Sequence, residues 1–145
     1  MFYPHKLLTD EDDRRVVQCI RHAESLTSGE IRVHFQRMKK GIVLAKAEEF
    51  FWKLNMRHTK HRNGVLIFVA PEMKEFAIMG DEGIDAVVPD CFWDDVALVL
   101  EKYFKEAQWA EGLCRAIQLI GEKLAEYFPV EDDDTNELTD EISYA

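Results

Sequence analysis

Five acidic side chains in this sequence could hold a metal ion. They are Glu30, Asp81, Glu82, Asp90 and Asp94. Carboxylate oxygens are the ligands that hard divalent cations prefer in proteins. If the fold brings these residues together, they predict a site for Ca²⁺ or Mg²⁺ that backbone carbonyl groups and water would complete. The alternative is that the acids form solvated ion pairs with nearby bases, worth about 0–1 kcal/mol each.

Two basic residues, Lys60 and Arg62, are expected beside these acids and could bind an anion. A metal held by carboxylates next to bases that hold an anion is an arrangement suited to metal-assisted phosphoryl chemistry. In this hypothesis the metal activates water, and Arg62 or Lys60 offsets the negative charge that develops on the phosphoryl group. The sequence has no Cys-x5-Arg motif and no Asp-x-Asp before a strand end, so no catalytic nucleophile is assigned.

Two further groups of residues are weaker candidates. His58 and His61 are spaced like a zinc-binding pair, but no third ligand follows at a recognisable spacing. A basic loop before the second predicted helix could hold an anion at the helix N-terminus, or could simply be solvated. That loop contains Arg37, Lys39, Lys40 and Gly41.

Three predicted strands position the acidic residues. Alternation over residues 30–36 predicts a strand with one buried face, the apolar run 65–70 predicts a strand buried on both faces, and residues 75–79 follow at hairpin distance. A helix between the first two strands makes them parallel, and the hairpin makes the third antiparallel to the second. This order returns Asp81 to the end of the sheet where Glu30 and Arg62 lie.

Apolar residues at helical spacing predict four helices. They run over about 9–26, from after Gly41 to about Met56, over about 92–105 and over about 109–128. Thr9 is followed by acids and is expected to cap the first helix. Gly112 and Gly121 are expected to let the last helix pack closely against a neighbour. The predicted fold class is α/β, a three-layer α/β/α sandwich around a small mixed β-sheet.

The composition predicts one soluble domain over residues 1–130 and an acidic, flexible tail over residues 131–145. The 145-residue chain is 47% hydrophobic and carries a formal net charge of −10, and seven of its acids lie in the tail. Such a charge argues against nucleic-acid binding, which needs a basic surface. No apolar run approaches the length of a membrane span, and no signal peptide opens the chain, so a cytoplasmic location is expected.

The cysteines and tryptophans have structural explanations. Cys19, Cys91 and Cys114 are odd in number and widely separated, which predicts buried free thiols and no disulfide framework. Tryptophans on helices are more often core residues, so the three tryptophans are expected to be buried. They are Trp52, Trp93 and Trp109. If they or the tail were exposed to a partner, the protein would be an interaction module.

Several motifs together resemble the TPM domain family over about residues 5–130. These motifs are Thr27-Ser28-Gly29-Glu30-Ile31-Arg32-Val33, Arg62-Asn63-Gly64-Val65-Leu66-Ile67, Phe76-Ala77-Ile78-Met79-Gly80-Asp81-Glu82-Gly83-Ile84 and Phe92-Trp93. The likeness is greatest to small stand-alone bacterial members. It implies an α/β/α sandwich, and divalent-cation binding and acid phosphatase activity have been attributed to some members.

The resemblance also bears on the candidate site. Glu30, Asp81 and Asp90 stand where the acidic site positions of the family fall, and Asp94 is less securely placed. The usual Gly-Tyr-Gly of the third-strand loop is replaced here by Gly80-Asp81-Glu82-Gly83, which adds acids. The function expected is therefore a divalent-cation-binding domain with weak metal-dependent phosphatase activity on a phosphate ester. The alternative is a non-enzymatic module that binds a protein partner.

Overall fold

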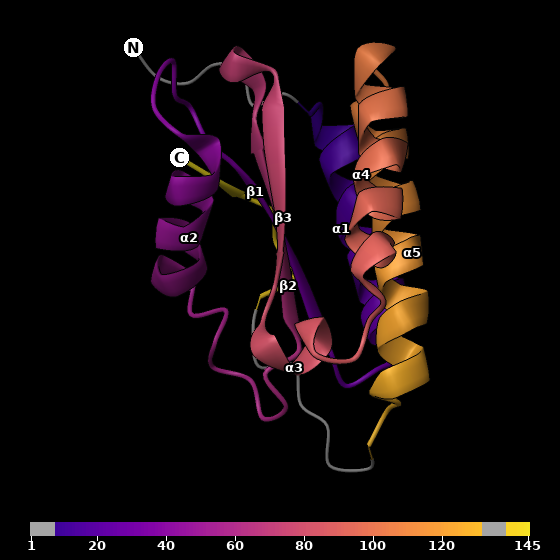
Figure 1. Ribbon diagram of the computed structural model, residues 1–145. Helices are drawn as coiled ribbons and strands as arrows, with labels where there is room; N and C mark the ends of the chain where they lie inside the picture. The colour runs from indigo at the N-terminus through magenta and orange to yellow at the C-terminus, as the bar shows by residue number, and fades with distance from the viewer. Residues whose placement is uncertain (1–7, 132–138) are drawn as a thin grey trace.

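The computed structural model describes residues 8–131 and 139–145 and is a three-layer α/β/α sandwich. Its elements are α1 (Asp10–Glu24), β1 (Glu30–Phe35), α2 (Val43–Lys53), β2 (Gly64–Ala70), the 3₁₀ turn Pro71–Met73, β3 (Glu75–Gly80), α3 (Glu82–Asp85), α4 (Asp90–Lys105), α5 (Trp109–Tyr127) and β4 (Ser143–Tyr144). Helix α2 covers one face of the sheet, and α1, α4 and α5 cover the other (Figure 1). The predicted fold class is confirmed.

The sheet is mixed and has the strand order β3-β2-β1-β4. Strands β1 and β2 are parallel, with Glu30 opposite Gly64, and β3 is antiparallel to β2, with Gly80 opposite Val65. Both predicted pairings are confirmed. The start of β1, the start of β2 and the end of β3 therefore lie at one edge of the molecule, as the crossover connection requires.

The central strand β2 separates two hydrophobic clusters. All seven of its residues are buried. Val65, Ile67 and Val69 pack in the cluster under α1, α4 and α5, whereas Leu66 and Phe68 pack in the cluster under α2. This confirms the prediction that the apolar run 65–70 is buried on both faces, because successive side chains of a strand point to opposite faces.

Local signals in the sequence explain the start of α1 and the packing of α5. The hydroxyl of Thr9 accepts a hydrogen bond from the backbone N–H of Asp12 at 3.1 Å, which confirms the predicted cap. A Cβ atom added to Gly121 would lie 2.8 Å from the Cβ atom of Ala23, and one added to Gly112 would lie 2.8 Å from that of Tyr103. Both glycines therefore permit close helix packing, as expected.

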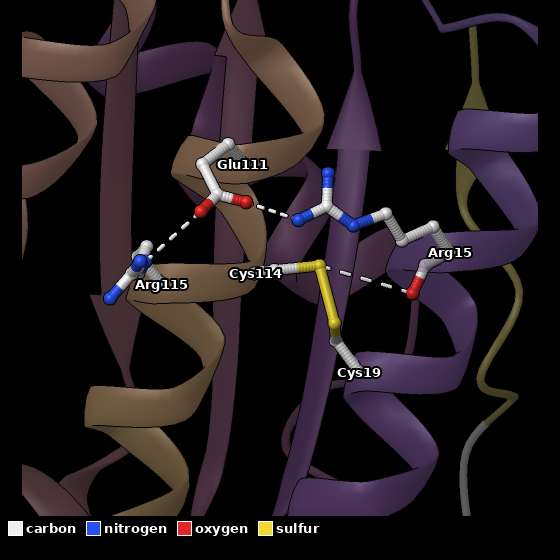
Figure 2. Close-up of a disulfide and its surroundings, with 5 residues drawn as sticks. All are labelled: Arg15, Cys19, Glu111, Cys114 and Arg115. Carbon is white, nitrogen blue, oxygen red and sulfur yellow. Dashed lines mark hydrogen bonds and ion pairs between the residues drawn. A yellow bond between two sulfur atoms is a disulfide. The ribbon is translucent and has the colours of Figure 1, made fainter.

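The prediction of buried free thiols is wrong. Cys19 on α1 and Cys114 on α5 form a disulfide with a Cα–Cα distance of 5.7 Å (Figure 2). The remaining cysteine, Cys91, is exposed. The two cysteines of the disulfide are 95 residues apart, so no local pattern in the sequence predicts that they pair. It becomes possible because α1 and α5 lie side by side on the same face of the sheet.

The tryptophan prediction is wrong at one position. Trp52 lies on the outer face of α2 and is 64% exposed, with the guanidinium of Arg57 stacked 4.2 Å from its ring centroid. Trp93 and Trp109 are partly buried against the main core. The buried face of α2 carries Val43, Ala47 and Phe51, and Trp52 lies outside it.

The acidic segment 131–145 ends in a strand that no sequence pattern predicted. Ser143 and Tyr144 form β4, which adds to the edge of β1, and Ile142 is buried in the main core. Residues 132–138 of the predicted tail lie outside the described residues. None of the helices in the described part of the chain combines the length and apolar character needed to cross a membrane.

Candidate functional site

Asp81 is the most firmly positioned of the predicted metal ligands. It follows β3 directly, and its backbone N–H donates to the carbonyl of Gly64 at 2.9 Å. Its Oδ1 atom accepts a hydrogen bond from the backbone N–H of Glu82 at 2.8 Å, which caps α3. The residue is only 5% exposed. The backbone bond fixes the main chain, and burial together with the hydrogen bond from Glu82 fixes the direction of the carboxylate.

The guanidinium of Arg62 faces this carboxylate. Its Nε and NH2 atoms donate to the two carboxylate oxygens of Asp81 at 2.6 and 2.9 Å, and its NH1 atom lies 3.1 Å from a carboxylate oxygen of Glu82. The hydrogen bond to Asp81 and the charges of Asp81 and Glu82 raise the pKa of Arg62. Arg62 has a backbone φ of 52°, a conformation uncommon for a residue with a side chain. The left-handed backbone at Arg62 thus places its side chain beside Asp81 and Glu82.

Gly83 lets the turn approach the loop before β2. Its N–H donates to the carbonyl of Arg62 at 2.8 Å, and an added Cβ atom would lie 2.0 Å from the carbonyl oxygen of His61. Only glycine permits this contact without a shift of the backbone. The carbonyl oxygens of His61 and Arg62 therefore lie against the first turn of α3.

The other predicted ligands lie on other elements than this pair. Asp90 is the first residue of α4, Asp94 lies one turn later, and both are exposed. Glu30 is only 3% exposed and lies near Glu24, at the start of β1. The described part of the chain contains no group of three or more His, Cys, Asp or Glu side chains arranged to hold a metal.

Both predicted anion-binding bases are engaged with acids. Arg62 pairs with Asp81 and Glu82, and the ammonium of Lys60 lies 3.4 Å from a carboxylate oxygen of Glu131. His61 also pairs with Glu131, and the hydrogen bond to His61 is the largest cause of a lowered pKa at Glu131. The geometry around these bases matches the ion pairs that the sequence left open as the alternative.

Two open hollows lie away from this turn. One, of about 570 Å³, lies at the entry to α2, and its lining includes Arg37, Lys40 and Gly41 from the basic loop. The other, of about 470 Å³, lies between α1 and α5, and the disulfide is part of its wall. Beside the disulfide, Glu111 pairs with both Arg15 and Arg115 (Figure 2).

A second acidic cluster was missed because it depends on the C-terminal segment. Burial and a hydrogen bond with Asp140 raise the pKa of Glu24 to about 10, and the nearby charges of Asp140 and Glu30 act in the same direction. The backbone N–H of Ile31 donates to Glu24 at 2.8 Å, which opposes this rise. Nothing in the sequence placed Asp140 beside the end of α1, because the contact joins residues far apart in the chain.

Comparison with known proteins places this architecture in a family. A family model of the TPM domain matches residues 2–123. The chain is similar to the BA42 protein of the psychrophilic bacterium Bizionia argentinensis, known from an NMR structure. The two share 43% sequence identity over 100% of both chains, and the TM-score is 0.91.

A second solved structure shares the fold at low sequence identity. It is the N-terminal domain of the cg2496 protein from Corynebacterium glutamicum, with 14% identity over 93% of this chain and 87% of that domain, and a TM-score of 0.66. No curated protein matches the sequence. The family model covers most of the residues, and the motifs that carried the resemblance lie in the sheet and the turns described above. The chain therefore belongs to the TPM domain family.

Proposed function

We propose that this protein binds a divalent cation, Ca²⁺ or Mg²⁺, at the turn between β3 and α3. The supporting observation is that the carboxylates of Asp81 and Glu82 converge on one cationic group, the guanidinium of Arg62, at 2.6–3.1 Å. A position where two carboxylates already hold a positive charge has the oxygen donors that a hard cation uses. The cation and Arg62 would compete for the same oxygens.

The environment of the turn suits such an exchange. The Arg62 side chain is 29% exposed, so it can turn outward into solvent, whereas Asp81 is held by its hydrogen bonds to the backbone. The exposed Glu82 can follow the cation, and the backbone carbonyl of His61 lies beside the turn. Water would complete the coordination. With only two carboxylates, we expect a dissociation constant on the order of 10⁻⁴–10⁻³ M, the range of weak calcium modules.

The ligand set is smaller than the one predicted from the sequence. Asp90 and Asp94 are solvent-exposed on α4, and Glu30 lies beside Glu24 at the start of β1, so we do not include them. Phosphate-ester hydrolysis is also outside the proposal. The bases that would bind a phosphoryl group, Arg62 and Lys60, form ion pairs with acids, which supports a cation site more than an anion site.

The test is a titration of three variants with CaCl₂ and MgCl₂, followed by backbone amide NMR shifts and calorimetry. Asp81→Asn keeps an oxygen that can cap α3 but removes the charge, so affinity should fall at least tenfold. Arg62→Gln removes the competitor, so affinity should rise severalfold above that of the wild type. Asp95→Asn changes an exposed acid on α4 and serves as the control.

Two results would contradict the proposal. One is the absence of shifts at residues 81–83 in both the wild type and Arg62→Gln at millimolar cation. The other is equal affinity in the wild type and Asp81→Asn, which would assign the binding to general surface charge.

A further inference from the structure

The edge of β1 carries side chains that recognise the segment added to it. Strand β4 runs parallel to β1, with Ser143 opposite His34 and Tyr144 opposite Phe35. The backbone N–H of Ala145 donates to the carbonyl of Phe35 at 2.9 Å, and that of Arg37 donates to the carbonyl oxygen of Ala145 at 2.7 Å. Addition of a strand to a sheet edge is a common way in which proteins bind extended peptides.

His34 recognises a hydroxyl group. The amide nitrogen of Gln36 donates to the carbonyl of Arg37 at 3.2 Å, which turns its Oε1 atom toward Nε2 of His34 at 2.9 Å. Nε2 must then carry the proton, so Nδ1 is left to accept the hydroxyl of Ser143 at 2.6 Å. His34 is only 1% exposed and stacks on Phe50 with ring centroids 4.3 Å apart. The acceptor is therefore rigid and prearranged.

The neighbouring positions recognise an apolar residue and a tyrosine. Ile142 is buried in the main core. The ring of Tyr144 stacks on Phe35 at a centroid distance of 5.4 Å, and its hydroxyl donates to a carboxylate oxygen of Asp13 on α1 at 2.7 Å. Backbone pairing, a hydroxyl acceptor, an apolar site and a tyrosine site thus select the order apolar residue, Ser or Thr, Tyr.

Asp140, two residues before Ile142, holds the start of this segment at the end of α1. It shares a hydrogen bond with the carboxyl of Glu24, and Arg21 lies 3.5 Å from it on an exposed flank. The geometry therefore anchors the segment at Asp140 as well as along β1.

We propose that the outer edge of β1 is a strand-addition site for an extended peptide with an apolar residue, a hydroxyl residue and a tyrosine in succession. Residues 142–145 occupy this site as an intramolecular competitor. The partner is an extended segment of another polypeptide that has this order. Its binding would release β4.

The test uses the full-length protein and a fluorescent peptide of residues 139–145. In the receptor, Ser143→Ala with Tyr144→Ala weakens the internal competitor while leaving every residue of β1 and α1 unchanged. We expect this receptor to bind the peptide at least tenfold more tightly than the wild type. The same peptide with alanine in place of its serine and tyrosine should lose at least tenfold in affinity.

Amide NMR provides an independent measurement on the wild type. Millimolar unlabelled peptide should shift the amides of Phe35 and Arg37 and move those of Ser143 and Tyr144 toward random-coil positions. The proposal is overturned if the folded Ser143→Ala/Tyr144→Ala receptor does not bind the peptide. It is also overturned if the alanine peptide binds as tightly as the unchanged peptide. The same holds if the amides that shift are not those of β1 and its neighbours. If the wild type were a dimer that the peptide dissociates, residues 142–145 of one copy would occupy the site of the other. That result would overturn the proposal that each chain fills its own site.

Discussion

At the residue scale, the partly buried Glu24 carboxyl links the stability of the protein to pH. It accepts the N–H of Ile31 and shares a hydrogen bond with Asp140, beside the carboxylate of Glu30. Desolvation and the two acids raise its pKa from 4.5 to about 10. The folded protein thus keeps a proton that the unfolded chain releases above pH 4.5, so the stability associated with this proton falls as the pH rises from about 4.5 to 10.

Replacing Glu24 with glutamine should therefore stabilise the protein at neutral and alkaline pH. The amide keeps an acceptor for Ile31 and supplies a permanent donor to Asp140. The free energy of unfolding of the wild type should fall by at most about 1.4 kcal/mol per pH unit between pH 5 and 9, and Glu24→Gln should remove most of that slope. Urea unfolding of both proteins at pH 5, 7 and 9 measures this dependence of the free energy of unfolding on pH.

Glu11→Gln is the matched control, because Glu11 is an exposed acid on the same helix. Its unfolding curves should follow those of the wild type at each pH. Equal slopes for the wild type and Glu24→Gln would show that Glu24 is ionised in the folded protein.

At the element scale, the contact between α1 and α5 depends on the absence of a side chain at Gly121. Eight residues of α5 are buried, and Gly121 lies against Ala23, near the end of α1. A methyl group at Gly121 would lie 2.8 Å from the Cβ atom of Ala23, which cannot rotate away. The two helices would have to separate, and close-packed interiors tolerate such shifts poorly.

Gly121→Ala should destabilise the protein by about 1–3 kcal/mol. The gain in helix propensity, about 1 kcal/mol, acts in the opposite direction. The double variant Ala23→Gly with Gly121→Ala moves the methyl group to the other helix and should recover part of the loss. Denaturant unfolding of both single variants and the double variant measures this coupling. If Gly121→Ala alone were more stable than the wild type, the contact would not be tight in solution.

At the scale of the whole molecule, the disulfide ties the first helix to the last. Cys19 and Cys114 enclose most of the sheet in a 95-residue loop. Closing a loop of this size restricts the unfolded chain, and loss of such a bond commonly costs about 2–5 kcal/mol. The cytoplasmic location predicted from the sequence stays a prediction. Disulfides are rare in that compartment, so whether this bond forms in the cell tests the predicted location.

Reduction, or Cys19→Ser with Cys114→Ser, should therefore lower the melting temperature, by roughly 2–4 °C for each kcal/mol lost in a chain near this size. Cys91→Ser should have little effect, because Cys91 is exposed and outside the bond. Thiol titration of the unfolded, unreduced protein should find one free thiol, and three after reduction. Three free thiols before reduction would contradict the bond.

Much of the fold was determined by local patterns in the sequence. The alternation in residues 30–36, the apolar run 65–70 and the hairpin to residues 75–79 predicted three strands and both of their pairings, because side-chain periodicity and the handedness of crossovers are local rules. The cap at Thr9 and the close helix packing at Gly112 and Gly121 were also predicted. The same patterns predicted that Asp81 and Arg62 would lie at one end of the sheet, where they form an ion pair.

Only the tertiary structure decided which distant residues meet. It paired Cys19 with Cys114, brought Asp140 to Glu24 and added Ser143 and Tyr144 to the edge of β1. It also left Asp90 and Asp94 exposed on α4, outside the ion pairs that Asp81 and Glu82 form with Arg62. Each of these outcomes depends on how helices and strands pack in three dimensions. A single sequence specifies that packing through the balance of all its contacts and carries no local signal for it.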